Sequence, residues 1–106
     1  VAASELDTRL VMRSLRNTER VLNNAAVERI IEKEKRLGQD LQFSDIVDEV
    51  AGVYPRIMKE GDMEIGAWSC GMVAGLIHDI PTCHDLIERI MREADQLIRQ
   101  RLNSML

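Results

Sequence analysis

Three small residues spaced four apart, Ala67, Gly71 and Gly75, constrain the fold of this chain more than any other feature of its sequence. Residues four apart lie on one face of an α-helix, so the pattern predicts a helix over residues 63–77 with a nearly bare contact face. Each glycine inside a helix costs roughly 0.5–1 kcal/mol relative to alanine. We therefore expect a helix, a sheet or a flat ligand to lie close against this face.

The first third of the chain predicts one long helix after an ambiguous start. Residues 1–16 fit a helix, but Thr8–Leu15 would equally form an extended segment. Behind Asn17, a good N-cap, the apolar residues recur with helical period and predict a helix over residues 18–37. Gly38 ends that helix, since glycine readily adopts the left-handed conformation that a helix end often needs.

The rest of the chain predicts three more helices besides the one over 63–77. Ser44 is the N-cap of a short helix that fades near Gly52, and Pro55 suits the first turn of the next segment, which breaks at Gly61. A long amphipathic helix follows Thr82, which approximates a capping box with an acidic residue three positions later. Its apolar stripe is Leu86, Ile87, Ile90, Met91, Ala94, Leu97, Ile98 and Leu102. The sequence thus predicts an all-α fold of about five helices.

Composition argues against several classes of partner. Aromatic residues make up 3% of the chain and its net charge is −4, so neither base stacking nor phosphate-backbone binding to nucleic acid is favoured. The longest apolar run, residues 65–77, is too short to span a bilayer, and no targeting segment is recognisable. Two cysteines, Cys70 and Cys83, without a secretory signal predict free, buried thiols in a reducing cytoplasm.

No self-contained chemistry is predicted. Cys70, His78, Cys83 and His84 match no zinc-ligand spacing, so we expect no metal site. Ser69 and Cys70 lack the strand–turn–helix context of an activated nucleophile, and no glycine-rich phosphate loop is present. Two interpretations of the small-residue face therefore stay open. It packs tightly within a protein, or it forms a backbone surface against a planar cofactor, flanked by Trp68 and Met72.

Two segments resemble the nitronate monooxygenase family, FMN-dependent proteins formerly called 2-nitropropane dioxygenases. Residues 61–83 read GDMEIGAWSCGMVAGLIHDIPTC and resemble the C-terminal end of that family. Residues 13–24 read RSLRNTERVLNN and resemble its Arg-x-x-x-Asn-Thr-x-Arg-Val-x-x-Asn segment. The resemblance spans about residues 5–98.

The resemblance implies that residues 1–106 are a single helical C-terminal region, packed in the intact enzyme across the mouth of a TIM barrel that binds FMN. Residues 1–16 would be the tail of that missing barrel, and a chain that begins at Val1 fits a fragment. Ser69, Gly71 and Met72 would line the flavin and substrate cavity, while the catalytic base would lie in the barrel. The isolated chain would then be inactive.

The implied reaction is the oxidation of alkyl nitronates with O2. Many relatives carry Gln where this chain has Met72, which leaves the substrate open, because some relatives reduce quinones with a nicotinamide donor and others reduce enoyl thioesters. The expected partners are the barrel and a small-molecule substrate, with no nucleic acid and no membrane. Without its barrel the fragment would expose apolar surface and self-associate. The rival interpretation is a free-standing helical interaction module that docks a partner helix on the 63–77 face.

Overall fold

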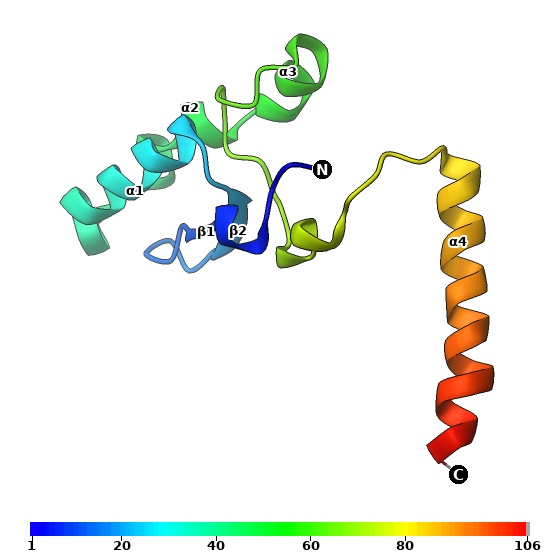
Figure 1. Cartoon of the computed structure of the whole chain (residues 1–106). Helices are drawn as coiled ribbons and strands as arrows, with labels where there is room; N and C mark the ends of the chain where they lie inside the picture. The colour runs from blue at the N-terminus through cyan, green and yellow to red at the C-terminus, as the bar shows by residue number, and fades with distance from the viewer. Residues whose placement is uncertain (106) are drawn as a thin grey trace.

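The computed structural model describes residues 1–105 as a mainly helical chain with one small antiparallel sheet (Figure 1). The strands are β1 (Thr8–Val11) and β2 (Glu19–Leu22), and the α-helices are α1 (Ala25–Leu37), α2 (Val47–Val50), α3 (Val53–Glu60) and α4 (Cys83–Gln96). Short 3₁₀ turns accompany them, namely η1 (Glu5–Asp7), η2 (Gly38–Asp40), η3 (Phe43–Asp45), η4 (Met72–Leu76) and η6 (Asn103–Met105). A π-helical turn, η5 (Leu97–Leu102), continues α4. The helical class is confirmed, but the all-α prediction is wrong in detail because of the sheet.

The hairpin of β1 and β2 replaces the first part of the expected helix over 18–37. The register pairs Arg9 with Val21 and Val11 with Glu19. Val11 and Val21 are both fully buried, so alternation along the strands places both valines in the core. For residues 8–11, the extended alternative is the correct one.

Helix α1 begins at Asn24 rather than Asn17. The Asn24 side chain accepts a hydrogen bond from the main-chain N–H of Val27 at 2.9 Å, as an N-cap does. Gly38 ends the helix, as the sequence predicted, but its φ of 55° and ψ of −119° lie outside the left-handed helical region. The buried face of α1 carries Ala26, Val27 and Ile30.

The breaks on either side of α3 lie where the sequence predicted them, but Ser44 lies within η3 and does not cap α2, which begins after Ile46. Gly52 and Gly61 flank α3 and both adopt the left-handed conformation, with φ of 66° and 72°. Pro55 lies in the first turn of α3, where its missing N–H leaves no helical hydrogen bond unmade. The buried core is aliphatic and joins the hairpin and α1 to the segments that precede α2 and follow α3; it consists of Val11, Met12, Val21, Val27, Ile30, Leu41, Ile46 and Ala67.

The predicted helix over residues 63–77 does not form. Ala67 donates its N–H to the carbonyl of Glu49 at 2.6 Å, and residues 68–70 run beside β2. Only residues 72–76 are helical, as the turn η4. Three glycines within ten residues make a helix intrinsically weak there, so hydrogen bonds to α2 and β2 determine the conformation instead.

Helix α4 begins where the sequence predicted, and its apolar stripe remains exposed. The hydroxyl oxygen of Thr82 accepts from the N–H of Asp85 at 3.1 Å, so Thr82 is the N-cap. No side chain of α4 is buried, and the stripe residues Leu86 and Met91 are 43% and 65% exposed. Figure 1 shows α4 standing apart from the body of the molecule, joined to it by an extended segment.

This arrangement makes the molecule elongated. Its radius of gyration is 18.3 Å, against about 13 Å for a compact domain of this length. Asp79 of the connecting segment forms an ion pair with Arg89 of α4 at 2.9 Å, and this pairing raises the pKa of the Arg89 guanidinium. Within residues 1–105, no helix is long and apolar enough to cross a bilayer.

Candidate functional site

The expected cofactor-contacting residues, Ser69, Gly71 and Met72, lie on an exposed edge beside the hairpin. Residues 68–70 extend the sheet as a short third segment, because Leu22 donates to the carbonyl of Trp68 at 2.9 Å and Cys70 donates to the carbonyl of Arg20 at 3.1 Å. Ser69 therefore lies opposite Val21 in an antiparallel bridge. The strand β2 thus holds Ser69 in place through the main-chain hydrogen bonds of the two residues beside it.

The polar groups of Ser69 are both engaged within the chain. Its N–H donates to the hydroxyl of Tyr54 at 2.8 Å, and its own hydroxyl bonds the carboxylate of Glu19. The ring of Tyr54 also stacks on Trp68, with 4.8 Å between the centroids and 27° between the planes. Trp68 therefore acts as a packing anchor that ties α3 to the 68–70 segment.

The three small residues serve three different contacts. Ala67 is buried in the core, 6% exposed. A Cβ added at Gly75 would lie 3.0 Å from the main-chain nitrogen of Glu5, so Gly75 allows η1 to approach η4 closely. A Cβ at Gly71 would meet only Val73, at 3.5 Å, which leaves Gly71 open to the outside. The expectation of close backbone contact holds at Gly75, but the three residues do not share one helical face.

Ser69, Gly71 and Met72 form an exposed surface that a flavin could contact, but they do not form a pocket that would enclose it. Gly71 and Met72 are exposed, Met72 by 56%, and could lie against a flat group through backbone and thioether. Ser69 has no donor to spare, since its N–H and hydroxyl are taken by Tyr54 and Glu19. A flavin would therefore need further protein surface to be held here.

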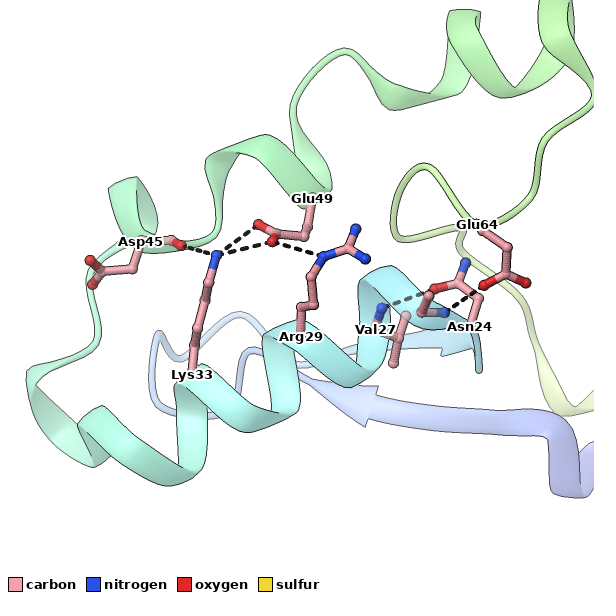
Figure 2. A network of polar contacts seen from close by, with 8 residues as sticks. Asn24, Val27, Arg29, Lys33, Asp45, Glu49 and Glu64 are labelled. Carbon is pink, nitrogen blue, oxygen red and sulfur yellow. Dashed lines mark hydrogen bonds and ion pairs between the residues drawn. The ribbon is translucent and has the colours of Figure 1, made fainter.

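A polar network that sequence reasoning missed joins α1 to α2 (Figure 2). Glu49 is 5% exposed, and its carboxylate accepts from Lys33 Nζ at 3.0 and 3.2 Å and from Arg29 Nε at 3.4 Å. Lys33 also donates to the carbonyl of Asp45 at 2.7 Å. Because the carboxylate meets two cations, its burial is compensated, and the network joins the two helices. The sequence contained one signal of this network, because Glu49 is an acidic residue among the apolar positions of a short helix.

Thiols and imidazoles are dispersed. Within residues 1–105, no group of three or more His, Cys, Asp or Glu side chains is arranged to hold a metal ion. Cys70 is half-buried and Cys83 is exposed, so the expectation of buried thiols is wrong. Cys83 begins α4, whose side chains all remain outside the core. His84 lies exposed in the first turn of α4.

Comparison with known proteins finds partial similarity to a dehydrogenase. The chain is 35% identical over 63 residues to a protein of Mycobacterium tuberculosis (strain ATCC 25618 / H37Rv), the (3aS,4S,5R,7aS)-5-hydroxy-7a-methyl-1-oxo-octahydro-1H-indene-4-carboxyl-CoA dehydrogenase. The aligned stretch covers 56% of this chain and 17% of that protein. No protein-family model matches the chain.

Proposed function

We propose that this chain is the C-terminal helical region of a larger FMN-dependent oxidoreductase, in which it covers one wall of the flavin and substrate cavity. The observation that carries the proposal is the unpartnered apolar face of α4, on which Ile87, Ile90 and Met91 are 61%, 55% and 65% exposed. Exposed apolar patches of this kind mark surfaces that another protein segment covers. A TIM barrel carrying the flavin would be that surface.

Within this proposal the chain contacts the flavin and substrate cavity and excludes water from it. Gly71 and Met72 would lie against the cavity through main chain and thioether, while the Tyr54–Trp68 stack and β2 keep this edge rigid. The chemistry supplied by the flavin would be oxidation of a nitronate, with the electrons returned to O2. The base for that step would lie outside this chain.

The mycobacterial similarity favours a second substrate class for the same site. The similar protein is by name a dehydrogenase of a carboxyl-CoA compound, which supports an oxidoreductase that acts on a CoA thioester. Reduction of enoyl thioesters or quinones belongs to the same proposal. These substrates differ in what must bind beside the flavin, so a substrate panel separates them.

A free-standing interaction module is the rival function. It is favoured by the same face of α4, because an amphipathic helix that packs on nothing can dock into a groove of another protein. Such a module would bind no flavin and would oxidise no substrate.

The test uses the full-length protein that contains this chain. We expect it to carry flavin absorbance that bleaches anaerobically on addition of an alkyl nitronate or a CoA thioester and returns with O2. Met72→Ala should lower kcat/KM, whereas Met58→Ala, an exposed methionine on α3, should leave it unchanged. A full-length protein without flavin absorbance would overturn the flavoprotein proposal and favour the interaction module.

A further inference from the structure

A cationic pocket of about 690 Å³ lies between β1, the hairpin loop and α1, on residues that the proposed function does not use. Its charged lining consists of Arg9, Arg13, Arg20, Lys35 and Glu34. Four cations against one carboxylate make the pocket locally positive, although the chain as a whole carries a net charge of −4. Such a concentration of one sign attracts ligands of the opposite sign.

Two hydrogen bonds hold the charged side of this pocket in place. Arg20 Nη1 donates to the hydroxyl of Thr8 at 2.7 Å, and Thr8 is only 7% exposed. Glu34 Oε1 accepts from the main-chain N–H of Arg13 at 3.0 Å, so the one carboxylate is engaged in holding the hairpin loop over α1. The Arg13 side chain is not part of that bond.

Three cations of the pocket form no ion pair within residues 1–105. In the part of the chain that the structure describes, the ion pairs involve Arg29, Lys33, Arg89 and Arg99, and none involves Arg9, Arg13 or Lys35. Apolar side chains of Leu10 and Ile31 line the same pocket. The pocket therefore offers free guanidinium and ammonium groups next to an apolar wall.

We propose that this pocket binds the phosphate groups of a nucleotide-like ligand, with coenzyme A thioesters as the source. Guanidinium groups match phosphate oxygens in paired, charge-assisted hydrogen bonds, and a lysine adds a mobile positive charge. Leu10 and Ile31 suit the less polar part of such a ligand. The phosphate chemistry is argued from the pocket alone, whereas the choice of coenzyme A over FMN rests on the proposed function and its CoA-thioester substrate.

The test titrates the full-length protein with coenzyme A, inorganic pyrophosphate and FMN by isothermal calorimetry. We expect the double variant Arg13→Gln/Lys35→Gln to weaken coenzyme A and pyrophosphate binding about tenfold or more, and added salt to weaken binding further. Both side chains are exposed, and the Arg13 main-chain bond to Glu34 is kept. The control Arg56→Gln/Lys59→Gln removes two exposed cations from α3 and should change binding less than twofold.

Loss of FMN binding in the pocket variant, with coenzyme A inert, would support a phosphate pocket whose source is the flavin. Absence of pyrophosphate binding, or equal weakening in the α3 control, would overturn the pocket. If the protein carries no flavin but binds coenzyme A more weakly in the pocket variant, this inference is supported and the proposed function is overturned. An active flavoprotein whose affinities for coenzyme A and pyrophosphate are unchanged in the pocket variant would support the proposed function and overturn this inference.

Discussion

The side-chain amide of Asn24 donates to the main-chain carbonyl of Gly66 at 2.9 Å, across 42 residues of sequence. The same nitrogen lies 2.6 Å from the carbonyl of Met63, and the amide oxygen caps α1 at Val27. One nearly buried side chain, 7% exposed, therefore begins a helix and fixes the segment that carries the candidate site. Glu64 lies beside Asn24 (Figure 2), and its carboxylate accepts from the main-chain N–H of Ala25, which strengthens the same junction.

Replacing Asn24 by alanine should destabilise the chain by about 2–4 kcal/mol. The helix loses its cap, and two carbonyl groups in the interior lose their donor. Urea denaturation followed by circular dichroism measures the change. Asn17→Ala, at an exposed position of the hairpin loop, is the matched control and should stay within about 0.5 kcal/mol. Equal effects of the two substitutions would contradict the structural role of Asn24.

Gly66→Ala and Gly71→Ala should behave in opposite ways. A Cβ at Gly66 would overlap the side chain of the buried Val53, so this substitution should cost about 1–3 kcal/mol through overpacking. At Gly71 the nearest side-chain atom would lie at 3.5 Å, and stability should change by less than about 0.5 kcal/mol. Thermal melts of the two variants compare them directly. Stabilisation by both substitutions would instead indicate the helix that the sequence predicted, because alanine favours helix over glycine.

Lys33→Met should lower stability by about 1–3 kcal/mol. It removes the closest cation from the Glu49 carboxylate and leaves that buried group with Arg29 alone, at 3.4 Å. Chemical denaturation measures the loss, with Lys59→Met on the exposed side of α3 as control. If Lys33→Met/Glu49→Leu recovers most of the lost stability, the loss came from an uncompensated charge. If it does not, the network stabilises the chain in another way.

Asp7 predicts a local response to acid. The main-chain N–H of Ser4, at 2.7 Å, and then its hydroxyl, at 2.9 Å, donate to this carboxylate and lower the pKa of Asp7 below its ordinary value of 3.8. Because the folded pKa is depressed, the capping turn is favoured above pH 3.8 and is lost as the pH falls through the lower, folded value. Carbon-detected NMR titration of Asp7 should give a midpoint below 3.8 that rises partway in Ser4→Ala. A midpoint unaffected by Ser4→Ala would contradict this assignment.

The apolar face of α4 should make the isolated chain self-associate. Ile90→Glu should reduce association in analytical ultracentrifugation without lowering the melting temperature, since Ile90 is 55% exposed and lies outside the buried core. Gln96→Glu adds the same charge to α4 outside the apolar stripe and should leave association nearly unchanged. A sharp monomer across all concentrations of the unaltered chain would contradict the need for a covering partner.

Local chemistry was enough to predict several element boundaries. Gly38, Gly52 and Gly61 end or separate helices because each adopts a positive φ that other residues rarely reach, and Thr82 caps α4 through its own side chain. Each of these signals acts within a few residues, so it can be read along the chain. The exposure of Gly71 and Met72, by contrast, depends on the hydrogen bonds that residues 66–70 make with groups far away in the sequence.

The sequence by itself determined the helical character of α1, α3 and α4, because capping groups, helix-breaking residues and the helical spacing of apolar residues act locally. Only the tertiary structure decided that residues 19–22 form a strand and that residues 63–71 leave the helical conformation. Val21 gains burial on the same face of the sheet as Val11, and Asn24, Glu49 and β2 supply hydrogen bonds to residues 63–70 from distant parts of the chain. A glycine-rich segment has too little intrinsic helix preference to resist such partners, and no local pattern reveals that the partners will be there.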